Sequence, residues 1–330
     1  MDTSVMITLG FLVFAIVMFA WEKIPLSITA MVVAVGLHLS GVLSAKEAFA
    51  GFVDPNVLLF MGMFVIGEAF FATGVAVGVG NVVHKFAKTE TSLLVAVMMI
   101  TGILSGFLSN TGTAAVLIPV IIGICKKSGF KQTKLLMPLV FAAAMGGNIS
   151  LIGAPGNMIA QAGLQQAGLG SFNFFDYGLV GLPILIVGTI FYATIGKRFL
   201  PDAPSHQPDG AFEGNDDYSH VPSWKKWTAA IILILTVAAM IFEKQLGVKL
   251  YVSAWIGALV LVATNVISET QAVKSIDMKT IMLFAGSMAL GDAMVKTGTG
   301  SVIADIIVNS LGASPSPIVV LVVIFVLGVF

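Results

Sequence analysis

Two short polar segments interrupt the apolar stretches of this sequence. The first is the triplet Ser109-Asn110-Thr111, inside the string LSGFLSNTGTAAVLIPV. Side chains that form hydrogen bonds are costly in hydrocarbon unless they find partners. Polar residues at a helix start leave backbone N–H groups beside the positive end of the helix dipole, which favours an anion. Hydroxyl, amide and carbonyl oxygens can also ligate sodium. The plainer alternative is a helix N-cap, for which Ser, Asn and Thr are preferred.

The second segment, GGNISLIGAPGN, runs from Gly146 to Asn157. Its four glycines and one proline in twelve residues disfavour a regular helix. Unwound backbone at membrane depth is tolerated only where it is buried in protein or lines a water-filled cavity. The carbonyls of this segment and the amides of Asn148 and Asn157 are therefore candidate ligands, and we expect bound ions to make both interruptions tolerable. Close packing of helices through small residues is the alternative.

Glu68 and Asp292 are carboxylates within apolar runs. An ionisable side chain inside a membrane span is a candidate functional residue. A Thr-Gly pair follows each acid five residues later, at 73–74 and 297–298, where the apolar run can end. Each acid can therefore simply reach water or a lysine, and both interpretations stay open.

The composition indicates that these residues lie in a membrane protein. The 330 residues are 57% hydrophobic and 10% charged, whereas soluble domains carry about 25% charged residues. A net charge of zero offers no electrostatic basis for binding nucleic acid. The single cysteine, Cys125, excludes an intrachain disulfide and a cysteine metal cluster, and the four histidines lack metal-ligand spacing. We expect a multi-pass protein of the plasma (inner) membrane, in contact with lipid.

Apolar runs long enough to enter or cross a bilayer follow one another along the chain. They lie near 5–20, 26–43, 56–73, 91–108, 112–125, 135–167 (interrupted), 174–196, 227–242, 251–267, 280–296 and 316–330. The polar stretch 200–226 is predicted to be a cytoplasmic linker. If 91–125 is a hairpin that enters and leaves on one side, thirteen of the seventeen Lys and Arg residues fall on that side, as the positive-inside rule predicts.

The sequence also repeats itself at a spacing of 224 residues. The residues that correspond without a gap include Ala30 and Ala254, Ser44 and Ser268, Gly62 and Gly286, and Glu68 and Asp292. Each copy then holds five crossings and one re-entrant hairpin, and because five is odd the second copy is inverted relative to the first. Inverted repeats with broken helices recur in secondary transporters.

We therefore predict an all-α integral membrane protein with inverted-topology repeats. Residues 1–199 form the first repeat, with the hairpin 91–125 and the broken helix 135–167. Residues 227–330 form a truncated second repeat that ends in the first arm of its hairpin. Under the 224-residue shift the triplet 109–111 corresponds to 333–335, past Phe330, so we expect the second half of the binding site to be missing.

The strings SNTGTAAVLIP at 109–119 and GGNISLIGAPGN at 146–157 resemble the divalent anion:sodium symporter family, the solute carrier 13 type within the ion transporter superfamily. In that family a Ser-Asn-Thr motif occupies the tip of each of two re-entrant hairpins, and a Gly-Pro-Asn break follows. The resemblance also implies a homodimer. The chain departs from the family pattern at Ala154-Pro155-Gly156, where Thr-Pro-Pro is common.

Carried over to this sequence, the resemblance implies two sets of ligands. The anion would contact Asn110, Thr111 and Asn157. Sodium, the coupling ion, would be held by Ser105, Ser109, Asn110, Asn148 and Gly153. No other cofactor is implied.

The predicted function is secondary active transport, by sodium-coupled symport of a small divalent anion such as a dicarboxylate or sulfate. A cation/proton antiporter or arsenite-type exporter of the same superfamily is the first alternative, and a fragment without activity of its own is another. A membrane enzyme or receptor is disfavoured, because the spans hold no paired acids, histidine cluster or nucleophile–base set. No G-x-x-x-x-G-K-[ST] motif supports ATP-driven transport.

Overall fold

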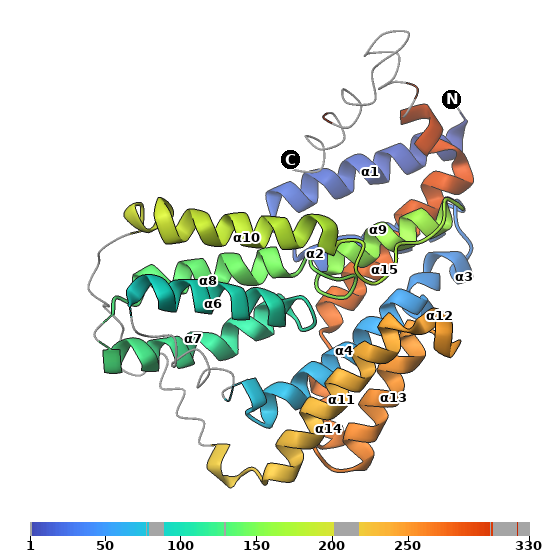
Figure 1. Ribbon diagram of the computed structural model, residues 1–330. Coiled ribbons are helices and arrows are strands. Elements are labelled where there is room, and N and C mark those ends of the chain that lie inside the picture. Colours follow the sequence, from blue (N-terminus) through green and yellow to red (C-terminus); the bar gives the residue numbers. More distant parts are fainter. Residues whose placement is uncertain are drawn as a thin grey trace. The chain divides into compact units, whose positions relative to one another are not determined.

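The computed structural model describes residues 2–76, 78, 89–128, 130–200, 218–303, 305 and 322 (Figure 1). All regular structure in this part is helical, which confirms the all-α prediction. Among the described residues, four helices are long and apolar enough to cross a membrane, by length and composition: α1 (Thr3–Trp21), α4 (Pro55–Ala72), α11 (Ser223–Ile241) and α15 (Met278–Thr297). The chain is an integral membrane protein.

Shorter helices complete the described part. The apolar ones are α2 (Leu26–Leu39), α6 (Glu90–Ser105), α7 (Asn110–Ser128), α8 (Thr133–Gly146), α10 (Gly178–Thr194) and α13 (Leu250–Ala263). The others are α3 (Ala45–Ala48), α9 (Pro155–Gln166), α12 (Glu243–Leu246) and α14 (Glu269–Ser275), with 3-10 turns η1 (Ala50–Val53), η2 (Gly196–Arg198) and η3 (Tyr218–His220).

These helices form two compact units. The terminal unit comprises residues 1–53 and 279–330, and the central unit comprises 54–278. The terminal unit therefore contains α2, from the first sequence copy, together with α15, from the second. The spatial units thus cut across the two copies of the repeat.

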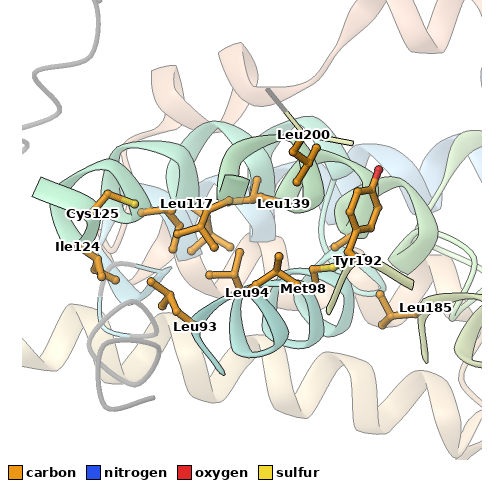
Figure 2. Close-up of a cluster of buried hydrophobic side chains, with 14 of the residues drawn as sticks. Leu93, Leu94, Met98, Leu117, Ile124, Cys125, Leu139, Leu185, Tyr192 and Leu200 are labelled. Carbon is orange, nitrogen blue, oxygen red and sulfur yellow. The ribbon is translucent and has the colours of Figure 1, made fainter. Parts of the chain in front are cut away.

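A buried apolar cluster holds one part of the central unit together (Figure 2). Most of its side chains come from α6, α7, α8 and α10, and Ile149 and Leu200 add to it from outside these helices. Leu93, Met98, Leu139 and Leu185 are essentially inaccessible to solvent. Figure 1 shows α6 and α7 as the two arms of a helical hairpin that packs against α8. Apolar burial of this kind fixes where the turn between the two arms lies.

The helix boundaries follow the 224-residue repeat. The 14-residue helix α2 begins at Leu26, and the 14-residue helix α13 begins at Leu250. Helices α4 and α15 correspond within one residue at each end. A residue with positive φ follows α2 and α13 at the same place, Gly41 (φ 77°) and Asn265 (φ 55°). The two copies therefore fold locally in the same way.

Each unit also contains a close contact between helices of different copies. In the central unit, a Cβ on Gly62 would lie 2.8 Å from the Ala254 Cβ. In the terminal unit, a Cβ on Gly286 would overlap the Ala30 carbonyl oxygen. Under the 224-residue shift these are the same two positions, exchanged between the copies.

The predicted apolar runs up to 280–296 correspond to helices, with the interruption in 135–167 between α8 and α9. The sequence analysis did not anticipate the short helices α3, α12 and α14. The predicted arm 316–330 lies outside the described residues except for Val322, as does most of the linker 200–226.

Candidate functional site

The turn between α6 and α7 is capped by Ser109. The Gly112 N–H donates a hydrogen bond to Ser109 Oγ (2.9 Å), and the Thr113 N–H donates to the Ser109 carbonyl (2.9 Å). Ser109 is therefore the N-cap of α7, as the plainer interpretation of the triplet predicted. Its hydroxyl oxygen already accepts a hydrogen bond from the backbone.

Asn110 connects the hairpin turn to the second interruption. Its amide contacts Ser105 Oγ (2.6 Å), the Ala143 carbonyl (3.2 Å) and the Gly153 carbonyl (3.1 Å). Because carbonyl oxygens can only accept, we assign the amide atom facing them as the nitrogen, which donates to them. Ser105 Oγ is fully buried and also donates to the Ala143 carbonyl (2.7 Å).

The second interruption is an irregular segment between Gly146, where α8 ends, and Pro155, where α9 begins. The Ser150 hydroxyl donates a hydrogen bond to the Gly106 carbonyl of the hairpin turn. Asn157 Nδ2 donates to the carbonyls of Gly147 (2.8 Å) and Ser150 (2.9 Å). The two interruptions therefore satisfy each other's backbone groups.

This arrangement changes the expected reason why unwound backbone is tolerated. We expected bound ions to satisfy this backbone. Carbonyls at the two interruptions instead accept hydrogen bonds from the hydroxyl and amide groups of Ser105, Asn110, Ser150 and Asn157. A buried carbonyl needs only one good donor to avoid most of its desolvation cost. The protein itself supplies those donors.

Small residues allow this close approach, as the packing interpretation predicted. A Cβ on Gly146 would overlap the backbone of Gly102, so α6 and α8 touch backbone to backbone. A Cβ on Gly153 would lie 2.5 Å from the Gly147 carbonyl oxygen. The glycines are therefore required by packing, independently of any ligand.

The starts of α7 and α9 lie next to each other. Asn110 is the first residue of α7, and its amide donates to Gly153, which stands two residues before the start of α9. The N-cap of α9, Ala154, has no side-chain hydrogen bond, and nothing lies within 4 Å of the Cβ position of Gly156. Two helix N-termini close together, one of them with an open approach, favour negative charge.

The predicted site residues differ in burial. Ser105, Gly153 and Asn157 are buried, Ser109 and Asn110 are partly exposed, and Thr111 and Asn148 are exposed. The structure brings Ser105, Asn110 and Gly153 into direct contact and links Asn157 to them through the segment 147–150. Within the described residues, the side chains of Thr111 and Asn148 make no hydrogen bond.

Comparison with known families identifies the protein's relatives. The sequence profile described as "CitMHS: Citrate transporter" matches residues 16–330. The chain belongs to this citrate transporter family. This family is in line with the predicted membrane transporter of the ion transporter superfamily. The solute carrier 13 type and sodium coupling stay predictions.

Curated relatives of this family member carry transporter names. The uncharacterized transporter YfbS of Escherichia coli is 33% identical over 211 residues, which cover 64% of this chain and 35% of the relative. The uncharacterized transporter sll0640 of Synechocystis is 31% identical over 201 residues, covering 61% of this chain and 33% of the relative. An uncharacterized transporter of Haemophilus influenzae is 26% identical over 319 residues, which cover 91% of this chain and 67% of the relative. The matches to the first two relatives thus span about a third of their length.

The site of this citrate transporter family member includes residues that the sequence analysis did not choose. Ser150 joins the two interruptions, and Tyr177 donates its hydroxyl to the Asn157 carbonyl (2.7 Å). Phe107 of the hairpin turn contacts Phe174 and Phe175, with ring centroids 6.4 and 6.2 Å apart. Ser150 stands inside the glycine-rich string and could have been found there. The loop that carries Tyr177 has no comparable signal.

The two predicted intramembrane acids of the transporter lie in different units, Glu68 in the central unit and Asp292 in the terminal unit. The Thr73 hydroxyl donates to the Ala69 carbonyl (2.6 Å), and α4 ends there, close after Glu68, as expected. No group of three or more His, Cys, Asp or Glu residues suited to a metal ion occurs in the described part of the chain.

Proposed function

We propose that this protein is a secondary active transporter that moves a small divalent or trivalent anion, a carboxylate or sulfate, by sodium-coupled symport across the plasma (inner) membrane. The observation that carries the proposal is the contact of Asn110 with the Gly153 carbonyl, because it joins the starts of α7 and α9. The family name adds citrate to the candidate anions.

The anion would bind where the two helices begin. Thr111 is exposed in the first turn of α7, and Pro155 and Gly156 are exposed in the first turn of α9. Pro155 has no N–H group, and the N–H groups of Gly112 and Asn157 already donate to Ser109 and Ala154. The N–H groups of Thr111 and Gly156, which have no acceptor inside their helices, are left for carboxylate or sulfate oxygens. Asn157, also in the first turn of α9, orients this end by its bonds to Gly147 and Ser150.

Sodium would bind among the oxygens beneath this surface. Asn110 lies within hydrogen-bond distance of Ser105 Oγ and of the carbonyls of Ala143 and Gly153, and Ser105 Oγ lies within hydrogen-bond distance of the Ala143 carbonyl. Oxygen ligands of this kind suit a hard cation, provided that the Asn110 amide rotates to present its oxygen. A cation in this position would lower the electrostatic cost of bringing an anion to the adjacent helix ends.

The reciprocal contacts of Gly62 with Ala254 and of Gly286 with Ala30 support an inverted repeat. In such a transporter the second copy supplies the other half of the site, and the hairpin-bearing part moves against a scaffold, which we expect to form a homodimer.

The test is uptake by the full-length protein in proteoliposomes. Radiolabelled citrate, succinate and sulfate are offered with an inward sodium gradient, with potassium in its place, and with a protonophore. We expect uptake that needs sodium for at least one of the three anions. Uptake of an anion that is indifferent to sodium would contradict symport with sodium and favour the antiporter or exporter alternative.

Three variants test the proposed ligands. Ser105→Ala and Asn110→Ala should raise the sodium concentration for half-maximal uptake by about tenfold or more, since each loses a ligand worth about 1–2 kcal/mol. Thr111→Ala should raise the apparent KM for the anion. The matched control is Thr194→Ala, because Thr194 is also exposed on a helix and bonds only to carbonyls of that helix.

A further inference from the structure

Glu68 is a carboxylate near the middle of an apolar helix. It stands between Gly67 and Ala69 in α4, a helix long and apolar enough to cross a membrane. Its side chain is only partly exposed, and within the described residues it makes no hydrogen bond or ion pair. An ionised carboxylate is costly in such surroundings unless it is paired or reaches water.

The neighbours of Glu68 on α4 contact the hairpin turn. The Cβ position of Gly67 lies 3.9 Å from Leu108 Cδ2, and a ring carbon of Phe71 lies 2.6 Å from the Cβ position of Gly112. Leu108 and Gly112 flank the triplet 109–111 on either side. Residues 67, 68 and 71 share one turn of helix, so Glu68 lies beside the surface that meets the proposed anion site.

Helices α7, α11, α13 and α14 pack against α4. Helices α7, α11 and α13 carry no carboxylate, and α14 carries the exposed Glu269. The described titratable groups on these four helices are Cys125, Lys225, Lys226, Tyr251, Glu269 and Lys274.

Both lysines of α11 already have partners. Lys225 Nζ donates to the Val266 carbonyl (3.4 Å) and Lys226 Nζ donates to the Tyr218 carbonyl (2.8 Å). Glu68 is the one carboxylate on α4, and its neighbours Gly67 and Phe71 contact the hairpin turn.

Building on the proposed function, we propose that Glu68 is a coupling residue that holds a proton from water more tightly when the anion is bound and releases it when the anion leaves. A carboxylate and an anion about 10 Å apart repel each other by an amount that changes the affinity about tenfold at an effective dielectric constant of about 20. Protonation removes this repulsion. By linkage, anion binding and protonation of Glu68 must favour each other equally.

The experiment compares the full-length wild type with Glu68→Gln, which keeps the size of the side chain and removes its charge. The apparent affinities for citrate and for sulfate are measured in proteoliposomes at a series of pH values between about 5 and 8. At each pH the affinity of the variant is divided by that of the wild type, which cancels the ionisation of citrate itself. Glu269→Gln, an exposed residue of α14, is the matched control.

For Glu68→Gln we expect the ratio to fall from about ten at the highest pH toward one as the pH is lowered. For the control we expect a ratio of one throughout. A ratio that does not change with pH overturns the proposal for Glu68 and leaves the proposed transport function intact. Absence of uptake of every anion by the wild type would instead overturn the transport function itself.

A second measurement follows the protons directly. Addition of the anion to proteoliposomes in weakly buffered medium should make the medium more alkaline as protons enter with it, and Glu68→Ala should reduce this change if Glu68→Gln does not fold. Uptake by the wild type without any entry of protons would also overturn the proposal.

Discussion

In the central unit Gly62 of α4 packs against Ala254 of α13, and in the terminal unit Gly286 of α15 packs against Ala30 of α2. The two contacts use the same two positions of the repeat. Their charged surroundings differ, because Glu47 of the first copy pairs with Lys296 (2.8 Å), whereas the corresponding positions, Gln271 and Ala72, are uncharged. Backbone packing is therefore common to both copies, while electrostatic contacts have diverged.

The largest expected effect is loss of the helix contact in the terminal unit. Gly286→Val would force side-chain atoms into the Ala30 carbonyl, which cannot move without displacing α2. We expect a loss of about 3 kcal/mol or more in the free energy of unfolding. Thermal unfolding in detergent, followed by size-exclusion chromatography, measures it. Gly10→Val is the control, because nothing lies within 4 Å of that Cβ position, and an equal Tm for both variants would contradict the contact.

A smaller change separates the two contacts from each other. The nearest atom to a Cβ on Gly62 is the Ala254 side chain, whereas the nearest to a Cβ on Gly286 is backbone. Gly62→Ala should therefore cost about 1 kcal/mol and be partly rescued by Ala254→Gly, and Gly286→Ala should cost more and not be rescued by Ala30→Gly. Double-mutant cycles on Tm give both coupling energies. Equal coupling in the two cycles would show that the contacts are equivalent.

The short helices after α2 and α13 should respond alike to loss of their caps. Ser44 forms a capping box with Glu47, and Ser268 forms one with Gln271. Ser44→Ala and Ser268→Ala should each cost about 1 kcal/mol locally. Hydrogen exchange of residues 45–48 and 269–275 should become faster in the corresponding variant. Ser171→Ala, at an exposed loop position, should leave both segments unchanged.

The smallest expected effect depends on pH. Hydrogen bonds from Lys296 and from Ser44 lower the pKa of Glu47 to about 2, below its ordinary value of 4.5. Because the folded pKa is depressed, the stabilisation is present above pH 4.5 and is lost as the pH falls toward 2. Glu47→Gln, which copies the residue of the second repeat, should flatten the dependence of Tm on pH in that window. An unchanged pH profile would show that the pair with Lys296 contributes nothing.

Much of the fold could be predicted from the sequence. The bounds of α4 and α7 follow from local signals, since Asp54 and Ser109 cap them and Pro55 suits a first helical turn. The interruption after Gly146 follows from glycine and proline. The short helices were missed because a segment of four to seven residues is too short to show an apolar periodicity.

The site could be predicted only in part. The sequence indicated which segments carry polar groups, but it could not show that Ser150 would bond to Gly106 or that the Ala143 carbonyl would receive both Ser105 and Asn110. Backbone carbonyls have no sequence signature, and Tyr177 reaches Asn157 from twenty residues away. The sequence therefore suggested ion ligands where the structure has hydrogen bonds between the two interruptions.

The sequence by itself determined that the chain is a membrane protein, that it repeats at a spacing of 224 residues and that its apolar runs are interrupted at two places. These three properties follow from hydropathy, residue identity and backbone preferences, which act locally. Only the tertiary structure decided that the two breaks satisfy each other, that Glu68 lies beside the hairpin turn and that helices pack across the copies. These features depend on which backbones can approach closely, and that is a property of pairs of helices that are distant in the sequence.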